Sequence, residues 1–507
     1  MSKIYEKSIS DKFSNYFEKP SLIKKKFASY DLRSHTISTP TETFPWDSSG
    51  GGVPLYYDDS SKKVYLDHTD SHSLIIGPTG SKKTRLVALP TIKNLSVAKE
   101  SMIISDPKAE LYSRTYMDLE KKGYKIFVIN LRSPERSNCW NPLYVPYKFY
   151  LENDIDHACE FANDIAENFM SENIEKDPFW ANSASAFLFG LILLLFKYCK
   201  DFNLSLDNVN LQNLFSLRDK LVFSNNKISP NLFWEYAKKD SIIFSAMVGT
   251  METVRETSSG ILSTLNEKLR SFSIQPNLLN MLSSNDIDFD IIGQKPTAVF
   301  LILPDEKTSY HRLVSLFVKQ SYEYLVYCAQ QHNGEDGLVS GKVPLRINYI
   351  LDEFSSLPTI KDFPAMITAA RSRNIRFSLF IQSKHQLLQK YNEETQTIQA
   401  NCSNWLFLSS REIDLLQEIS SLCGNVYGQH VKPLISVPEL QQLDKKYGET
   451  LILCKNNKPY ITKLPDISEY DNDSYLIGSF PIQEHKKIDT TIFYEELNKN
   501  VMSLFSA

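Results

Sequence analysis

Short apolar runs rich in β-branched residues recur along the chain, and most of them are followed by a turn or a helical pattern. They lie at residues 73–76, 102–104, 126–129, 298–303, 347–351, 377–381 and 405–408. Nearly continuous apolar strands of this length are typical of a parallel sheet that is covered on both faces. The stretches 84–98 and 312–330 between them have helical patterns. The alternation predicts an α/β fold with a mostly parallel, doubly wound sheet.

The pattern also predicts how the chain divides into domains. Residues 1–60 read as an irregular N-terminal arm, and residues 61–145 with 296–465 as the α/β domain. Residues 146–295 break the alternation, which predicts an inserted, mostly α-helical domain. Residues 466–507 read as a polar tail with helical residues near its end.

The longest apolar run, residues 186–196, covers about half of the roughly 20 residues that span a bilayer. We expect it to be a buried core helix and not a membrane anchor.

Composition narrows the functional classes only slightly. Apolar residues make up 42% of the 507 residues and charged residues 23%, which is ordinary for a globular protein. The net charge of −4 does not by itself indicate a nucleic-acid binder. Seven cysteines without a CxxC pair favour reduced thiols in the cytosol and suggest no metal centre.

Polar residues or turns follow the predicted strands. Since open α/β sheets bind ligands beyond the carboxyl ends of their strands, these groups are candidates for a single site. They are Gly77, Asp106, Asn130, Asp305, Asp352, Gln382 and Ser409.

The first predicted strand leads into a phosphate-binding loop, Gly77-Pro78-Thr79-Gly80-Ser81-Lys82-Lys83-Thr84, which precedes a predicted helix. In such a loop the backbone N–H groups cradle phosphate oxygens. Lys83 is expected to reach the β- and γ-phosphates and Thr84 to hold Mg²⁺. The predicted cofactors are therefore ATP and Mg²⁺.

Lys82 stands where the pattern GxxxxGKT requires glycine. Glycine serves where the backbone adopts a conformation that other residues avoid, so a Cβ here puts ATP binding in doubt. One interpretation is a working ATPase, and the other is a degenerate loop that keeps the fold without the nucleotide. A further hypothesis places the Lys82 ammonium beside the phosphates as an extra cation, which makes binding salt-sensitive.

Four more residue types complete the predicted site. Asp352 and Glu353 end a buried strand, as in a Walker B motif, where Asp352 holds Mg²⁺ and Glu353 orients the attacking water. Gln382, at the end of a neighbouring strand, contacts either the γ-phosphate or its attacking water, or is an ordinary polar strand end. Arg371 and Arg373 are either arginines inserted into a neighbouring subunit's site or a surface pair.

Asp106 has two possible roles. It either reaches the metal ion or caps the helix that follows it.

The ordered set of motifs resembles the type IV coupling proteins, the substrate-receptor ATPases of conjugation and type IV secretion. The stretches that carry the resemblance span roughly residues 65–445. They are the loop from Gly77 to Thr84, Asp106-Pro107-Lys108-Ala109-Glu110, Trp140-Asn141-Pro142-Leu143, Phe179-Trp180 with the apolar run after it, Leu351-Asp352-Glu353-Phe354, Ala369-Ala370-Arg371-Ser372-Arg373-Asn374 and Ile381-Gln382-Ser383.

The resemblance implies a RecA-like P-loop domain with an inserted all-α domain, assembled as a hexameric ring. It implies binding of DNA, a relaxase or relaxosome as cargo, and a type IV secretion channel as recipient. The sequence departs from the family pattern at Lys82, at Ala109 and in the missing N-terminal membrane helices. We therefore expect a cytoplasmic protein, peripheral at the inner face of the membrane, that works with a separate small membrane-anchor protein.

Three functions compete. The first is an ATP-driven motor that hands DNA or a relaxase–DNA complex to the channel. The second is a non-hydrolysing receptor of the same fold, favoured by Lys82. The third is a related DNA translocase, which leaves Trp140-Asn141-Pro142-Leu143 and the long helical insertion unexplained.

Overall fold

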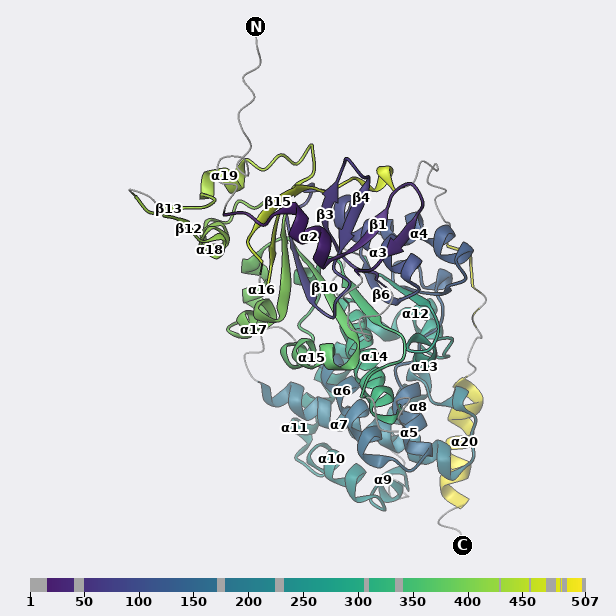
Figure 1. Ribbon diagram of the computed structural model, residues 1–507. Helices are drawn as coiled ribbons and strands as arrows, with labels where there is room; N and C mark the ends of the chain where they lie inside the picture. The colour runs from purple at the N-terminus through teal and green to yellow at the C-terminus, as the bar shows by residue number, and fades with distance from the viewer. Residues whose placement is uncertain are drawn as a thin grey trace. The chain divides into compact units, whose positions relative to one another are not determined.

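The chain forms two compact units (Figure 1). One comprises Met1–Val128, Phe289–Asp305 and Ser321–Ser479, and the other Ile129–Asp288, Glu306–Gln320 and Phe480–Ala507. The computed structural model describes residues 16–40, 50–170, 178–223, 232–304, 310–332, 341–427, 430–455, 457–470, 480–483, 485 and 490–503.

A nine-stranded sheet with the order β15-β14-β11-β5-β10-β9-β6-β8-β7 forms the centre of the fold. The neighbouring strands from β11 to β8 run parallel, whereas β14 and β15 are antiparallel additions at one edge. The strands are β5 (His72–Ile76), β6 (Ser101–Asp106), β7 (Lys125–Asn130), β8 (Thr297–Ile302), β9 (Ile347–Leu351), β10 (Ile375–Ile381), β11 (Cys402–Phe407), β14 (Glu449–Cys454) and β15 (Tyr460–Lys463). All the predicted strands are present, and the α/β fold class is confirmed.

Burial on both faces explains why the central strands are apolar at nearly every position. Every residue of β5, β6, β8, β9 and β10 is buried. Helices α3 and α4 pack against β6, and α15 packs against β10 (Figure 1). The helices that belong to this part of the chain are α3 (Leu89–Ala98), α4 (Glu110–Lys121), α13 (Phe289–Ile292), α15 (Phe363–Ala370), α16 (Lys384–Tyr391), α17 (Glu394–Asn401), α18 (Ile413–Cys423) and α19 (Val437–Gln441). Helix α14 (His311–Gln331) belongs to it from Ser321 onward, and its residues up to Gln320 belong to the other unit. A short hairpin joins β12 (Asn425–Val426) to β13 (Lys432–Pro433).

The prediction of an irregular N-terminal arm is wrong for the part of it that the structure describes. Helix α2 (Pro20–Lys26) precedes a four-stranded antiparallel sheet with the order β2-β1-β4-β3. Its strands are β1 (Ala28–Asp31), β2 (Thr36–Ser38), β3 (Pro54–Asp58) and β4 (Lys63–Leu66). Strands of three to five residues are too short to give a clear alternation, and their apolar residues are buried only by pairing across the chain.

The second unit is helical. Its helices are α5 (Tyr144–Leu151), α6 (Ile155–Met170), α7 (Pro178–Asp201), α8 (Leu211–Phe223), α9 (Leu232–Ala237), α10 (Ser241–Met251), α11 (Arg255–Ser273), α12 (Pro276–Met281) and α20 (Thr490–Ser503). Helix α20 packs against α8 and buries Phe493, Leu497 and Val501, so the predicted polar tail contributes to the core. The domain boundaries drawn from the sequence stay a prediction.

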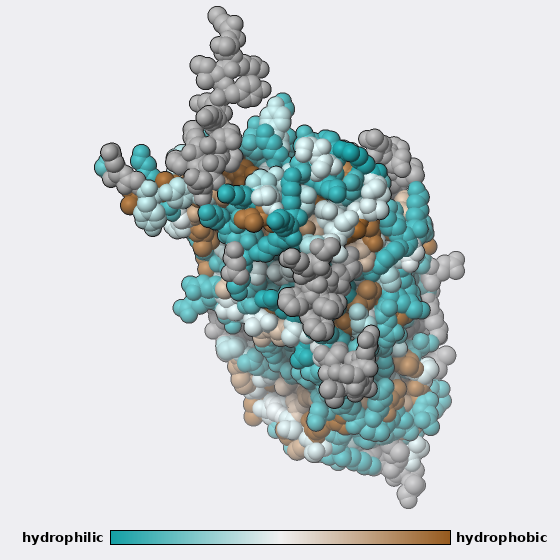
Figure 2. All heavy atoms as spheres, viewed as in Figure 1, coloured by the Kyte–Doolittle hydropathy of each residue, from teal (hydrophilic) through white to brown (hydrophobic). Residues whose placement is uncertain are grey.

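Helix α7 is long and apolar enough to cross a membrane when judged by length and composition alone. Its 24 residues pack against α6, α10 and α11, and 67% of its most apolar window is buried inside the protein. The visible face of the protein is mostly hydrophilic with scattered apolar residues (Figure 2).

Candidate functional site

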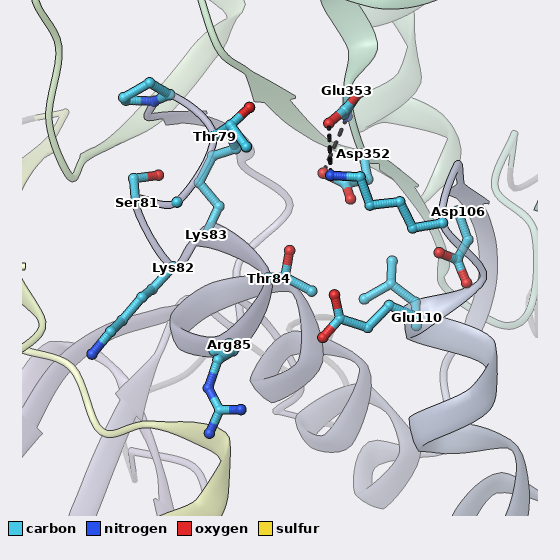
Figure 3. A pocket seen from close by; sticks show the side chains of 14 residues that line it. Thr79, Ser81, Lys82, Lys83, Thr84, Arg85, Asp106, Glu110, Asp352 and Glu353 are labelled. Atoms are coloured by element: carbon cyan, nitrogen blue, oxygen red, sulfur yellow. Dashed lines mark hydrogen bonds and ion pairs between the residues drawn. The ribbon is translucent and has the colours of Figure 1, made fainter. Parts of the chain in front are cut away.

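A pocket of about 270 Å³ lies beyond the carboxyl ends of β5, β6 and β9 (Figure 3). This is the edge at which open α/β sheets bind ligands. The loop after β5, the loop after β6 and two carboxylates after β9 line it. The lining residues are Pro78, Thr79, Gly80, Ser81, Lys82, Lys83, Thr84, Arg85, Asp106, Lys108, Glu110, Leu111, Asp352 and Glu353. The tertiary structure thus brings together residues that lie up to 275 positions apart in the chain, from Pro78 to Glu353.

The loop after β5 folds tightly because two of its positions are glycine. A Cβ on Gly77 would lie 2.4 Å from Ser81 Oγ, so any other residue there would force the Ser81 side chain to move. Gly80 has a φ of +79°, a left-handed conformation that glycine adopts at little cost. The Ser81 N–H donates to the carbonyl of Pro78, and a π-helical turn, Thr84–Ala88, then leads into α3.

Lys82 adopts the backbone conformation that the pattern reserves for glycine. Its φ is +66°, and for a residue with a Cβ this conformation costs roughly 1–2 kcal/mol. Its side chain points away from Asp352 and Glu353 (Figure 3), and its ammonium donates to the Lys446 carbonyl at 3.2 Å. In this structure the ammonium is therefore held away from the two acidic residues, and the hypothesis that it lies beside the phosphates stays a prediction.

Lys83 is buried inside the loop. Its ammonium donates to the carbonyl of Gly77, so the cation is held by the loop itself. Burial lowers the pKa of Lys83, while Asp352 and Glu353 oppose that shift. A buried ammonium whose hydrogen-bond partner among the described residues is a neutral carbonyl is poised to bind an anion.

The two acidic residues after β9 are both partly buried. Desolvation, with the nearby charge of Glu353, raises the pKa of Asp352 to about 6. Glu353 has a φ of +54°, and its N–H donates to Asp352 Oδ1 at 3.1 Å. The turn between them presents both carboxylates to the pocket, on the side away from Thr79 and Ser81 (Figure 3).

Gln382 is connected to Glu353 and to the loop. Its Nε2 donates to Glu353 Oε1 at 2.9 Å, and its Oε1 accepts from the Thr79 hydroxyl at 3.2 Å. One amide therefore links the phosphate-binding loop to the second acidic residue. Strands β5 and β10 are paired neighbours, and this pairing places Gln382 beside the loop.

Asp106 acts as a helix cap. Its Oδ2 accepts from the N–H of Tyr112 at 2.8 Å, in the first turn of α4. Burial raises its pKa to about 7, although backbone hydrogen bonds from Tyr112, Leu111 and Glu110 oppose this shift. Of its two possible roles, the geometry favours the cap.

Arg371 and Arg373 are not brought to the pocket. They form a 3-10 turn directly before β10, at the amino ends of the parallel strands. β10 has seven residues and spans about 23 Å, so these arginines lie at the opposite edge of the sheet from Gln382. Arg371 pairs with Asp70 at 3.0 Å, and Arg373 donates to the Gly341 carbonyl. Asp305 lies outside the described residues.

Sequence reasoning assigned no role to Lys108, which lines the pocket with its Nζ 3.9 Å from Glu353 Oε1. The signal was present, because Lys108 follows the polar end of β6. It also missed the anchoring of Arg85 by a bidentate pair with Asp466.

Trp140 and Asn141 have packing roles within the helical unit. Trp140 is buried with its Nε1 donating to Gln320, and Asn141 Nδ2 donates to the Val209 carbonyl at 2.6 Å.

Comparison with solved structures gives the same fold. The unbound bacterial conjugative coupling protein TrwBdeltaN70 matches with a TM-score of 0.57 at 15% identity, covering 85% of this chain and 90% of that one. Plasmid coupling protein TrwB in complex with ADP and Mg²⁺ matches with a TM-score of 0.56 at 15% identity, covering 85% and 91%. The complex of TrwB with the ATP analogue ADPNP matches with a TM-score of 0.55 at 15% identity, covering 83% and 89%.

No curated protein matches the sequence. The family model for type IV secretory system conjugative DNA transfer, in contrast, matches residues 14–460, which is most of the chain. The protein therefore belongs to the type IV secretory system conjugative DNA transfer family, the coupling proteins.

Proposed function

We propose that this coupling protein binds ATP with Mg²⁺ in the pocket formed by residues 77–84, and that ATP hydrolysis drives the delivery of DNA to the transfer channel. The observation that carries the proposal is the convergence of Lys83, Asp352 and Glu353 at one pocket, with Gln382 hydrogen-bonded to Glu353. TrwB, a structural neighbour of 15% identity, has been solved with ADPNP and with ADP and Mg²⁺, which supports the choice of nucleotide.

The pocket suits a phosphate chain. At about 270 Å³ it is slightly smaller than the roughly 300–1,000 Å³ of sites that enclose whole drug-sized ligands, which favours the polyphosphate part of a nucleotide. Ser81 Oγ is buried without a hydrogen-bond partner in the described part of the chain, so the loop holds an unused polar group. Lys83 offers a buried ammonium, and Asp352 with Thr84 offers the oxygen ligands that Mg²⁺ prefers.

Each residue then has a defined task. Lys83 and the loop amides hold the phosphates, while Thr84 and Asp352 hold the metal ion. Bound Mg²⁺ supplies neutralisation of the phosphate charge. Glu353 accepts a hydrogen bond from the attacking water and orients it. Gln382 keeps Glu353 Oε1 fixed through the 2.9 Å hydrogen bond, which leaves the other carboxylate oxygen for the water.

The first experiment measures nucleotide binding by calorimetry and ATP turnover with and without single- and double-stranded DNA. We expect turnover that rises with DNA and that falls at least about a hundredfold in Lys83→Ala, since removing one strong transition-state contact costs about 3 kcal/mol. Lys82→Gly is measured in parallel. Binding in both wild type and Lys82→Gly shows that the loop tolerates lysine.

The second candidate is a non-hydrolysing receptor, which the left-handed Lys82 favours. It predicts no binding by wild type and restored binding by Lys82→Gly. That result removes the motor proposal and leaves the fold as a docking scaffold for cargo and channel.

The partners and assembly belong to the proposal too. We propose a homo-oligomeric, hexameric ring that engages relaxase–DNA cargo and a separate small membrane-anchor protein at the inner face of the membrane. Imaging the tagged protein in cells that lack every other transfer protein tests the anchor. Localisation to the membrane in those cells contradicts it.

A further inference from the structure

Lys108 is a cationic motif residue of the pocket for which the proposed mechanism provides no task. It lies in the loop between β6 and α4, directly before Ala109, whose φ of +57° turns the chain into α4. Its side chain is 53% exposed, and its ammonium lies 3.9 Å from Glu353 Oε1. The same oxygen accepts the hydrogen bond from Gln382.

Of the other cations of the pocket lining, Lys82 and Arg85 are held by groups outside the pocket, and Lys83 already has a task in the proposed mechanism. The Lys82 ammonium donates to Lys446 outside the pocket, and the Arg85 guanidinium is paired with Asp466. The Lys83 ammonium lies on the carbonyl of its own loop. Lys108 is therefore the lining cation that lies beside Glu353. Asp106 and Glu353 lie across the pocket from Thr79 and Ser81 (Figure 3).

The charge of Lys108 acts on the centre of the pocket. It contributes to lowering the pKa of Lys83, after the larger effect of burial, and it opposes the rise in the pKa of Asp352. An anion held between Lys83 and Asp352 therefore lies within the field of Lys108. Lysine suits such a role, because its compact charge is carried on a flexible stem.

The pair between Lys108 and Glu353 is easily exchanged. Half-exposed pairs of this length contribute only about 0–1 kcal/mol, because water screens them. A phosphate that carries more charge than one carboxylate competes for the ammonium at little cost. The carboxylate of Glu353 is then left with Gln382 as its partner and is available to water.

We propose that Lys108 senses the terminal phosphate of the nucleotide: it pairs with Glu353 in the empty pocket and transfers to the outermost phosphate of a nucleoside triphosphate. The inference rests on the proposed function and deepens it, because it makes Lys108 the residue that distinguishes triphosphate from diphosphate and that releases Glu353 for the attacking water. A diphosphate lacks the group that draws Lys108 away.

The test compares affinities for a non-hydrolysable ATP analogue and for ADP, each with Mg²⁺, in the full-length protein. In Lys108→Met we expect analogue affinity to fall about tenfold, the loss of one charge-assisted contact of about 1.4 kcal/mol, while ADP affinity stays within about twofold. Lys108→Arg is expected to keep the preference for the analogue over ADP, since arginine keeps the positive charge. Lys121→Met, an exposed lysine at the end of the same helix α4, is the matched control and is expected to change neither affinity.

A thermodynamic cycle with Glu353→Gln tests the exchange itself. In the wild-type background, Glu353→Gln removes the carboxylate that holds Lys108, and we expect the affinity for the analogue to rise about two- to fivefold, as for the loss of a weak pair. In the Lys108→Met background, we expect Glu353→Gln to leave the affinity for the analogue unchanged.

If Lys108→Met lowers the affinities for the analogue and for ADP equally, or lowers neither, the proposed role of Lys108 is wrong while the ATPase proposal stands. Absence of all nucleotide binding in wild type overturns the proposed function, and this inference with it.

Discussion

At the residue scale, the site depends on three left-handed positions that are not glycine. Lys82, Ala109 and Glu353 have φ values between +54° and +66°, and each stands at a turn that shapes the pocket. Such strain clusters at functional sites, where the surrounding structure enforces it. The sequence identified Lys82 as the weak point of the loop, and the structure shows that the loop closes around it while its side chain leaves the pocket.

Replacing Lys82 by glycine should stabilise the protein. We expect Lys82→Gly to raise the free energy of unfolding by about 0.5–1 kcal/mol, because relief of the left-handed strain exceeds the entropy lost by glycine. Thermal unfolding measures this as a higher midpoint. Ala109→Gly should act in the same direction, whereas Lys121→Gly, in right-handed helix, should lower the midpoint. A lower midpoint for Lys82→Gly contradicts the assignment of strain.

At the element scale, the alignment of β5 with β10 positions the loop beside Gln382. The strands pair in parallel from Ser73 opposite Ser378 to Ile76 opposite Ile381. At the amino end of β5, the buried His72 Nδ1 accepts from the N–H of Phe377 at 3.0 Å. This bond is made by the neutral imidazole, so the alignment carries a pH dependence.

His72 should make the fold acid-sensitive. Burial, with a smaller effect from the positive charges of Arg371 and Arg376, lowers its pKa from 6.5 to about 4, against weaker opposing effects of the Ile367 backbone and the charge of Asp70. Below pH 6.5, His72 binds a proton in the unfolded chain but stays neutral in the native state. Stability is therefore lost as the pH falls from 6.5 to 4, by about 3 kcal/mol in all.

The measurement compares urea unfolding of wild type and His72→Asn across this range. The asparagine Oδ1 replaces the Nδ1 acceptor without titrating. As the pH falls, the free energy of unfolding of the variant should therefore decrease less than that of wild type. His385→Asn, at an exposed position in α16, should follow wild type. Parallel curves for all three proteins rule out this role for His72.

At the scale of the whole molecule, the predicted arginines and the pocket are separated by the length of a strand. Arg371 and Asp70 are 44% and 42% exposed, so their pair contributes little stability and the guanidinium remains accessible. Arg371 cannot reach the pocket of its own chain from the opposite edge of the sheet. A role in hydrolysis therefore requires a neighbouring subunit.

Arg371→Ala should leave the affinity for the ATP analogue unchanged within about twofold and reduce turnover at least about tenfold, since it removes a charge supplied in trans. Turnover is measured on the assembled protein. Mixing Arg371→Ala with Lys83→Ala should restore part of the activity, because some interfaces then pair an intact loop with an intact arginine. Asp70→Ala should keep turnover. If the mixture recovers no activity, Arg371 has no role in the site of a neighbouring subunit and is an ordinary surface residue.

Much of the central fold could be predicted from the sequence because its strands are buried on both faces. Such strands are apolar throughout, as β9 is from Ile347 to Leu351, and this signal survives without knowledge of their partners. The loop from Gly77 to Thr84 and the pair Asp352-Glu353 were predictable for a related reason: each follows such a strand directly. The N-terminal sheet was not predictable, because strands as short as Thr36–Ser38 are defined by their pairing.

The sequence by itself determined the α/β class, the coupling-protein family and the residue types offered to a phosphate chain, since these depend on local pattern and on the order of motifs. The tertiary structure alone decided which groups meet. Strand order placed Gln382 on Glu353, burial raised the pKa of Asp352, and the turn at Ala109 brought Lys108 beside Glu353. It also placed Arg371 at the far edge of the sheet, because distances across a sheet depend on strand direction and pairing, which no local pattern records.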